Sequence, residues 1–417
     1  MSSSPTDLLG TLRERGFVQQ VTDEAALRAL LGSGRVTAYI GFDPTAPSLH
    51  VGHLVQVLML MHLQRAGHRP VVLVGGGTGR VGDPSGKTEM RQLLDEDAIR
   101  HNLEKFRRIF ARFLDFEGDR ALVVDNADWL LQLHYIEFLR HVGRHFSVNQ
   151  MLTAEAYKQR LEKGLTFLEF NYQILQAYDF HVLHERHGCR VQMGGSDQWG
   201  NICAGVDLVR RMDGAEVYGL TIPLITTSDG KKMGKSEKGA VWIDAELYSP
   251  YDFFQYWVNI DDRDVERFLK LFTFLPLEEI RVLTQEGGAA LRSAKKRLAL
   301  EVTELVHGRA EAEKAERAAA ALFSGSGADL EGAPVTELRR SELPIGILDL
   351  LVRTGLVSSK SDARRLIQQG GAQLGEARLE AIDLAVDASH FSEAELLLRA
   401  GKRKFHRVKL VDGGDAR

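Results

Sequence analysis

Short apolar runs alternate with longer amphipathic or apolar stretches in the first third of the chain. VTAYIGF at 36–42, PVVLVGGG and ALVVDN are the lengths of strands and rich in β-branched residues, as buried strands are. Between the first two runs, LVQVLMLMHLQRAG predicts a helix whose last turn is followed by Gly67. Strands that alternate with helices indicate an α/β fold built on a parallel sheet.

The loop between the first strand and this helix is the first candidate for a ligand site. Asp43 and Pro44 stop the strand, so the residues up to the helix lie at the carboxyl edge of the predicted sheet. Open α/β folds bind their ligands at this edge.

The pattern changes twice further along the chain. From Tyr248 to about Phe323 it is mostly helical, and SGSGADLEGAP then provides a Gly, Ser and Pro-rich stretch. We therefore expect a catalytic domain at 1–247, a helical domain at 248–323, a linker at 324–343 and a small domain at 344–417.

Composition narrows the class of protein. With 44% hydrophobic and 26% charged residues, and no run of about 18 apolar residues, the chain is expected to be soluble and not to enter a membrane. The start, MSSSPTDLLG, has no basic segment followed by an apolar one, which predicts a cytoplasmic location. Cys189 and Cys203 belong to no CxxC pair, so we expect reduced thiols and no tightly bound metal.

Basic charge is concentrated near the end of the chain. The net charge is −4, yet residues 344–417 hold 12 Lys and Arg against 10 Asp and Glu. The clusters there are typical of surfaces that bind phosphate backbones, although a solvated charged face is the alternative. The candidates for RNA contact in this part are Arg364, Arg365, Lys402, Arg403 and Lys404.

Two glycine motifs do not support the function that they first indicate. GTGRVG at 77–82 fits a dinucleotide fingerprint, but DPSG follows where a helix should begin and hold the pyrophosphate. GKT at 86–88 ends like a phosphate-binding loop, yet Val81 stands where its first glycine is needed and Pro84 has no amide to donate.

Two other motifs, about 180 residues apart, form the strongest signal. His50-Val-Gly-His53 follows the first strand, and Lys232-Met-Gly-Lys235-Ser236 lies on a loop of small residues. Imidazole and ammonium groups can bind phosphate oxygens and neutralise their charge. Each motif alone is also compatible with capping histidines or with a solvated lysine turn.

The two motifs resemble the signatures of class I aminoacyl-tRNA synthetases. Longer segments, among them FDPTAPSLHVGH, FLEFNYQILQAYDF, GGSDQWGN and PLITTSDGKKMGKS, resemble bacterial tyrosyl-tRNA synthetases over nearly the whole chain. The resemblance implies a Rossmann-like catalytic domain, a helical domain and a small α+β S4-like RNA-binding domain. It also implies a ligase that uses ATP and Mg²⁺ to activate L-tyrosine and transfers it to tRNA(Tyr), as a homodimer.

Site residues follow from the resemblance position by position. The implied tyrosine-binding residues are Tyr39, Asp83, Tyr172, Gln176, Asp179 and Gln192. The implied ATP-binding or catalytic residues are Gly41, Asp43, Thr45, His50, Gly52, His53, Gly195, Asp197, Lys232, Lys235 and Ser236, with Lys87 and Arg91 as mobile cations. Arg210 and Arg211 are implied contacts for the tRNA acceptor stem.

Some features depart from the family pattern or leave alternatives open. Gln56 stands where family members vary in their ribose contact, and Lys231 competes with Lys232 as phosphate ligand. The C-terminal hairpin reads GAQLGE at 371–376, where the family pattern is GxVxVNG. The related synthetase for tryptophan and an RNA-binding protein on the same scaffold are the competing interpretations.

Overall fold

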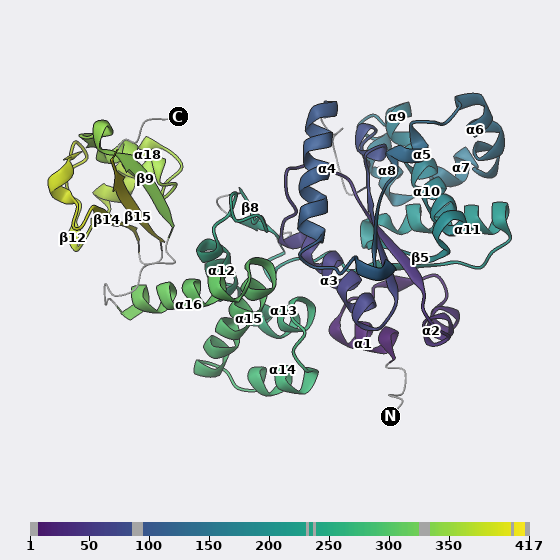
Figure 1. Ribbon diagram of the computed structural model, residues 1–417, viewed down its shortest axis with the longest axis horizontal. Helices are drawn as coiled ribbons and strands as arrows, with labels where there is room; N and C mark the ends of the chain where they lie inside the picture. The colour runs from purple at the N-terminus through teal and green to yellow at the C-terminus, as the bar shows by residue number, and fades with distance from the viewer. Residues whose placement is uncertain are drawn as a thin grey trace. The chain divides into compact units, whose positions relative to one another are not determined.

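The protein forms two compact units. The computed structural model describes residues 7–85, 95–230, 233–236, 239–324, 334–401 and 404–412 (Figure 1). The first unit comprises Met1–Lys235, Ala240–Asp244 and Ile260–Leu298, and the second comprises Ser236–Gly239, Ala245–Asn259 and Ala299–Arg417.

A six-stranded sheet, in the order β1-β6-β5-β2-β3-β4, forms the centre of the first unit. Only β1 runs antiparallel to its neighbour, which confirms the predicted α/β class. The chain order reverses between β5 and β2, the point at which such sheets open a crevice for ligands. The strands are β1 (Gln20–Val21), β2 (Thr37–Phe42), β3 (Arg69–Val74), β4 (Leu122–Asp125), β5 (Cys189–Gly195) and β6 (Tyr218–Ile222).

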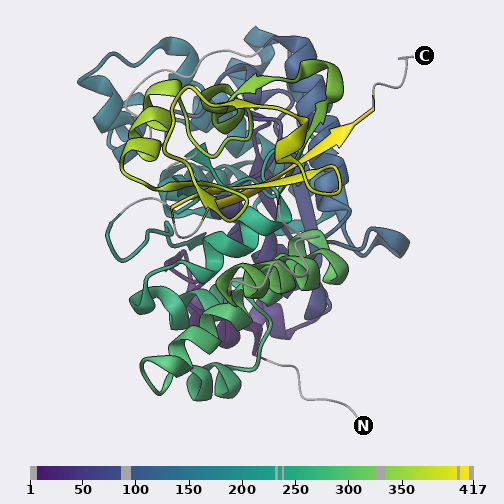
Figure 2. The same ribbon diagram turned by 90° about the vertical axis from the view of Figure 1, so that its left-hand side faces the viewer.

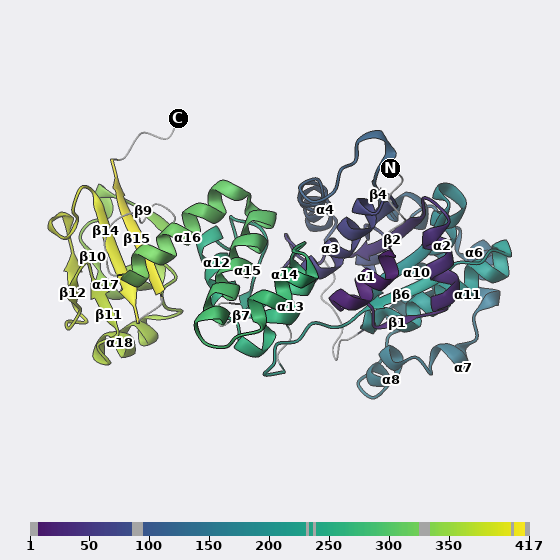
Figure 3. The same cartoon turned by 90° about the horizontal axis from the view of Figure 1, so that it is seen from below.

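Helices cover both faces of this sheet. Figure 1 shows α3 and α4 on one side and α10 and α11 on the other, and Figure 3 shows the same layers from below. α3 is apolar on almost every side and is buried accordingly. The helices of this unit are α1 (Leu8–Arg15), α2 (Glu24–Gly32), α3 (Val51–Arg65), α4 (Glu96–Phe110), α5 (Ala127–Leu130), α6 (Tyr135–His141), α7 (Val148–Met151), α8 (Glu155–Leu161), α9 (Phe167–Phe170), α10 (Tyr172–His187), α11 (Trp199–Asp213), α13 (Val265–Phe272) and α14 (Leu277–Thr284).

The second unit contains helices ahead of its C-terminal sheet. α12 (Pro250–Val258) and α16 (Arg309–Ser324) belong to it, whereas α15 (Ala289–His307) contributes residues to both units. Two short strands, β7 (Lys235–Ser236) and β8 (Gly239–Ala240), precede α12 in the chain.

The C-terminal part of the second unit is built on a five-stranded sheet in the order β12-β11-β14-β15-β9. β14 and β15 are long neighbouring strands, drawn in yellow in Figure 2. α17 (Ile347–Arg353) and α18 (Lys360–Gln368) precede the predicted hairpin, which β11 and β12 form. The strands of the five-stranded sheet are β9 (Val335–Arg339), β11 (Ala372–Leu374), β12 (Ala377–Arg378), β14 (Glu395–Ala400) and β15 (Lys404–Val411). β10 (Ile345–Gly346) and β13 (Ala385–Val386) pair as a separate two-stranded sheet.

The range predicted as a linker contains one strand of this sheet. β9 pairs in parallel with β15, and its Leu338 is fully buried in the apolar core of the C-terminal part. A strand this short has too few residues for its alternating pattern to stand out in the sequence.

Among the described residues, no helix combines the length and apolar character that a bilayer crossing requires.

Candidate active site

A cavity of about 160 Å³ opens at the carboxyl ends of β2 and β5. This is the edge of the sheet at which the sequence predicts ligand binding. Most of the residues that the resemblance assigns to tyrosine or ATP line it: Tyr39, Gly41, Asp43, Thr45, His53, Asp83, Tyr172, Gln176, Asp179, Gln192, Gly195 and Asp197, together with Gln56.

Asp179, on α10, is a buried carboxyl group at this cavity. It accepts a hydrogen bond from Trp129 Nε1 at 2.8 Å and another from Asn126 Nδ2 at 3.0 Å. Burial raises the pKa of Asp179 to about 8, although both hydrogen bonds oppose the shift. Trp129 and Asn126 are not among the predicted residues, yet Asn126 ends the run ALVVDN at the same edge of the sheet, which was a usable signal.

Tyr39 and Gln192 lie beside each other on paired strands and are both about 1% exposed. The Tyr39 hydroxyl and both amide atoms of Gln192 are buried and, within the described part of the chain, have no hydrogen-bond partner. Leaving a buried polar group unpaired costs about 1–3 kcal/mol. These groups therefore favour a ligand whose buried end carries a hydroxyl or a similar polar group.

A second carboxyl group lies elsewhere on the cavity wall. Asp83 accepts hydrogen bonds from the Ser85 amide at 2.8 Å and from Gln198 Nε2 at 2.7 Å. Burial raises the pKa of Asp83 to about 6. Gln176 Oε1 accepts from Asn201 Nδ2 at 3.1 Å, so an amide also faces this part of the wall. A cationic group on a ligand would stabilise the ionised form of Asp83.

Asp43 connects the end of β2 to two other elements. Its carboxylate accepts from Tyr172 Oη at 2.8 Å and from Thr78 Oγ1 at 2.7 Å. Asp43 and Tyr172, which the resemblance assigns to the ATP and the tyrosine respectively, are thus in direct contact.

The glycines after β3 serve packing rather than phosphate binding. The Gly76 amide donates to Asp125 Oδ1 at 3.1 Å and the Gly77 amide to Asn126 Oδ1 at 2.7 Å. A side chain at Gly75 or Gly76 would collide with Asp43 or Asp125. In the described residues that follow, up to Ser85, a single 3₁₀ turn, Thr78–Arg80, is the one helical segment, so no α-helix begins there to hold a pyrophosphate.

The first signature forms the N-terminus of α3. His50 is the N-cap, and its Nδ1 accepts from the Gly52 amide at 2.9 Å. His53 Nδ1 accepts from the His50 amide at 3.3 Å, and the two rings lie 3.9 Å apart. Because both Nδ1 atoms are acceptors, the neutral rings carry their protons on Nε2 and can donate from there. The two histidines therefore cap the helix and share a face.

Backbone hydrogen bonds through Val241 connect the second signature to the first. The Val241 amide donates to the Gly234 carbonyl at 2.8 Å, and the Val51 amide donates to the Val241 carbonyl at 2.9 Å. A Cβ at Gly52 would come within 2.7 Å of the His50 ring and 3.3 Å of the Met233 carbonyl oxygen. Residues 233 and 234 thus pack directly against the start of α3.

Several predicted residues are not placed. Lys87, Arg91, Lys231, Lys232, Lys402 and Arg403 lie outside the described residues, and of Lys235 and Ser236 only the backbone is described. The remaining predicted RNA contacts are exposed: Arg210 and Arg211 on α11, Arg364 and Arg365 on α18, and Lys404 on β15.

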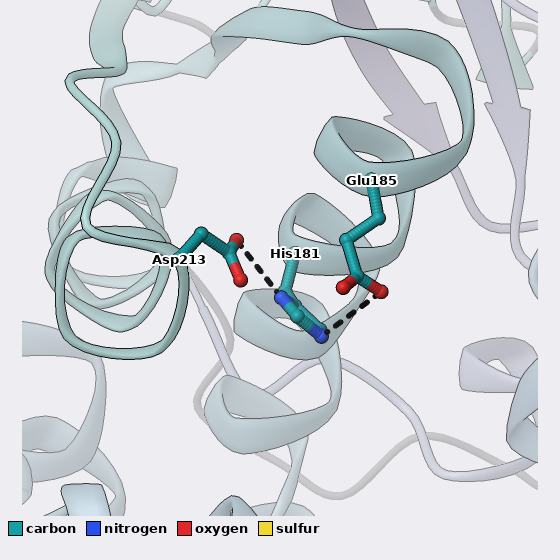
Figure 4. A group of neighbouring side chains, drawn as sticks. All are labelled: His181, Glu185 and Asp213. Atoms are coloured by element: carbon teal, nitrogen blue, oxygen red, sulfur yellow. Dashed lines mark hydrogen bonds and ion pairs between the residues drawn. The ribbon is translucent and has the colours of Figure 1, made fainter.

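One cluster in the described chain has metal-ligand chemistry: His181, Glu185 and Asp213 (Figure 4). His181 Nδ1 lies 3.0 Å from Asp213, and its Nε2 lies 3.5 Å from Glu185. The two carboxylates therefore face different nitrogens of one buried ring. The arrangement joins α10 to the end of α11.

Comparison with known proteins covers both units. Residues 32–324 match the family described as tRNA synthetases class I (W and Y), and residues 328–408 match the Tyrosine--tRNA ligase SYY-like C-terminal domain. A tyrosine--tRNA ligase of Acetivibrio thermocellus is 52% identical over 403 residues, which are 96% of this chain and 98% of that protein. One of Clostridium botulinum (strain Hall) is 52% identical over 397 residues, 95% of this chain and 98% of that protein.

Solved structures agree with these matches. A C-terminally truncated mitochondrial tyrosyl-tRNA synthetase of Aspergillus nidulans is similar with a TM-score of 0.68 and 32% identity, covering 75% of this chain and 93% of that one. The corresponding Coccidioides posadasii structure has a TM-score of 0.66 and 34% identity, with 75% and 91% covered. With matches along both units and relatives more than half identical over almost its entire length, the chain belongs to the tyrosine--tRNA ligase family of class I synthetases.

Proposed function

We propose that the cavity at the ends of β2 and β5 binds L-tyrosine beside ATP and forms tyrosyl-adenylate and diphosphate there. The observation that carries this proposal is the group of buried polar atoms of Tyr39, Gln192 and Asp179. The phenol of tyrosine supplies one donor and two acceptor positions and fits such a group. Phenylalanine would leave the Tyr39 hydroxyl and the Gln192 amide unpaired, so the pocket rejects it without an editing step.

The opposite end of the substrate is its ammonium group, for which we propose Asp83. Gln176 and Tyr172 line the same cavity and complete a polar surface around that position. The ammonium charge offsets the cost of ionising the buried Asp83 carboxyl, so binding and deprotonation are coupled.

For the nucleotide we propose the edge formed by the first signature. Gly41, Thr45, Gly195 and Asp197 line the cavity next to His53, and the Nε2 donors of His50 and His53 can bind phosphate oxygens. Lys232, Lys235 and Ser236, with Lys87 and Arg91, would neutralise charge that develops as diphosphate leaves. Mg²⁺ is expected to enter with ATP and to add to this neutralisation.

Transfer to tRNA is the second proposed step. The terminal adenosine hydroxyl attacks the tyrosyl carbonyl, and AMP leaves. Arg210 and Arg211 on α11 are proposed to contact the acceptor stem, while Arg364, Arg365 and Lys404 on the C-terminal sheet and helices contact phosphates elsewhere. In this arrangement residues 1–247 carry the chemistry, 248–323 the anticodon side and 344–417 the S4-like RNA contact. The cytoplasm stays the predicted location.

We further propose a homodimer. Eight large apolar residues between 131 and 168 are exposed, and so many exposed apolar side chains in one stretch of chain are unusual on a protein that remains a monomer. We call this set the apolar cluster; it comprises Leu131, Tyr135, Ile136, Leu139, Val148, Leu161, Phe167 and Leu168.

Amino-acid-dependent ATP–diphosphate exchange, measured with each of the twenty amino acids and without tRNA, tests the proposal. Exchange with tyrosine alone is expected. Exchange with tryptophan or phenylalanine at a similar rate would contradict the assignment of the pocket. The variant Asp179→Ala should lose tyrosine-dependent exchange, and its full activity would contradict the role of that carboxyl.

A further inference from the structure

The segment that leads into the second signature is a closed turn. The Gly230 amide donates to the Thr227 carbonyl at 2.8 Å, and Gly230 has a positive φ of 80°. The Met233 amide donates to the Ile225 carbonyl at 2.9 Å. Residues 225 and 233 are therefore held together at the base of the turn. Lys232 precedes Met233 directly in the sequence.

This turn is hydrogen-bonded to a buried carboxylate that lies 36 residues further along the chain. Asp264 is 2% exposed and stands at the N-cap position of α13. Its Oδ2 accepts from the Ser228 amide at 2.8 Å, and its Oδ1 accepts from Arg267 at 2.7 Å. Arg267 also donates to the Thr226 carbonyl. The Asp264–Arg267 ion pair thus binds the backbone of the turn at Ser228 and at Thr226.

The capping of α13 does not explain Asp264. An aspartate at the N-cap ordinarily accepts from amides of its own helix, whereas this side chain makes no such bond. Its acceptor capacity is directed at the turn and at Arg267 instead. Hydrogen bonds to a buried carboxylate are stronger than neutral ones, so the attachment is rigid.

The far end of the same segment is fixed on the first signature. Gly234 has a positive φ of 89°, and a Cβ there would lie 3.0 Å from His50 Nδ1 and 3.1 Å from the Gly52 amide nitrogen. Thr226 and Ser228 are therefore held by Arg267 and Asp264, and Gly234 lies against the start of α3.

We propose that Asp264 and Arg267 are positioning residues for the activation step: they hold the base of the turn so that the lysines of the second signature reach the phosphates of ATP. This inference rests on the function proposed above. It assigns to the pair no contact with tyrosine, because neither residue lines the cavity. Their loss should consequently affect the nucleotide step and spare tyrosine binding.

The test compares the full-length variants Asp264→Ala, Asp264→Asn and Arg267→Met with Arg281→Met. Arg281 is an exposed arginine on α14 whose ion pairs, with Glu14 and Glu278, lie at the surface, which makes it a matched control. For each protein, the kcat of ATP–diphosphate exchange, the KM values for ATP and tyrosine, and the melting temperature are measured.

We expect Asp264→Ala to lower kcat/KM for ATP by about tenfold or more, with the KM for tyrosine within about twofold of the wild type. Asp264→Asn retains an acceptor for the Ser228 amide, so its kcat/KM for ATP should fall by less than that of Asp264→Ala. Arg267 is partly exposed, so Arg267→Met should fold even if the alanine variant does not, and should show the same selective loss.

Two results would overturn the inference. One is an unchanged kcat/KM for ATP in both Arg267→Met and Asp264→Asn. The other is a rise in the KM for tyrosine as large as the fall in kcat/KM for ATP, which indicates general destabilisation. If the wild type itself shows no tyrosine-dependent exchange, the proposed function fails instead, and that outcome is separate from the other two.

Discussion

Single side chains around the cavity are placed at a cost to the free energy of folding. Asp179 is buried with a raised pKa, and Tyr39 and Gln192 have buried polar atoms without partners among the described residues. Folding alone favours none of these features, because each leaves a polar group less well solvated than in the unfolded chain. A ligand that pairs with them recovers this free energy on binding.

Replacing Tyr39 with phenylalanine should separate stability from binding. Removal of a buried hydroxyl without a partner is expected to leave the melting temperature unchanged or to raise it. The same change should raise the KM for tyrosine about two- to tenfold, because one hydrogen bond to the phenol is lost. Thermal unfolding and exchange kinetics on the same preparation check both parts. A lower melting temperature with an unchanged KM would show that the hydroxyl is structural.

The pKa of Asp179 predicts a pH dependence of stability. The folded-state pKa of about 8 lies above the unfolded value of about 3.9, so the folded protein binds the extra proton. The stabilisation is complete below about pH 4 and is lost as the pH rises through about 8. Relative to Asp179→Asn, the ligand-free wild type should lose up to about 1.4 kcal/mol per pH unit in this window.

Denaturant unfolding of both proteins at pH 6 and pH 8 measures this difference. The contribution of Asp83, whose pKa is also raised, is present in both proteins and cancels. A difference in unfolding free energy that is independent of pH would mean that Asp179 titrates in its ordinary range.

At the scale of elements, the sequence pattern predicted the helices and strands that have a clear periodicity or a clear end signal. β2 and the position of Gly67 after the helix agree with the predictions, whereas α3 begins at Val51, before the predicted stretch that starts at Leu54. The short helices between 127 and 170 were not predicted, because segments of four to seven residues carry too little periodicity. Trp129 lies on one of them, and its contact with Asp179 depends on packing across 50 residues of chain.

The two roles of His50 at the start of α3 can be separated by substitution. His50→Ala removes the N-cap and should cost about 1 kcal/mol of stability, whereas His50→Asn supplies another capping acceptor and should cost less. If the imidazole also binds phosphate, both variants should lose exchange activity by about a hundredfold. Wild-type exchange in the asparagine variant would reduce His50 to a helix cap.

For the whole molecule, the resemblance and the comparisons agree on family, ligase activity and fold class. The sequence pattern alone does not predict the contact between subunits, since it does not separate an exposed apolar residue from a buried one. Exposure in the folded chain supplies that distinction. Phe167, at the start of α9, is 69% exposed and belongs to the apolar cluster proposed as the dimer contact.

Replacing Phe167 with aspartate should dissociate the dimer, because it places a charge in a contact that excludes water. Sedimentation velocity over a range of concentrations should show a dimer for the wild type and a monomer for the variant. Val282 on α14 is similarly exposed, at 68%, and lies outside the cluster, so Val282→Asp serves as the control. Dissociation of both variants, or of neither, would contradict the proposed contact.

The glycines that follow β3 limit how the enzyme can be re-engineered. Gly75 and Gly76 have no room for a side chain, since Asp43 and Asp125 occupy the space that a methyl group would need. A library that varies these positions to admit larger tyrosine analogues should therefore yield few folded members. Tyr39 and Asp179, which contact the cavity through side chains alone, are the positions at which new substrate specificity can be selected.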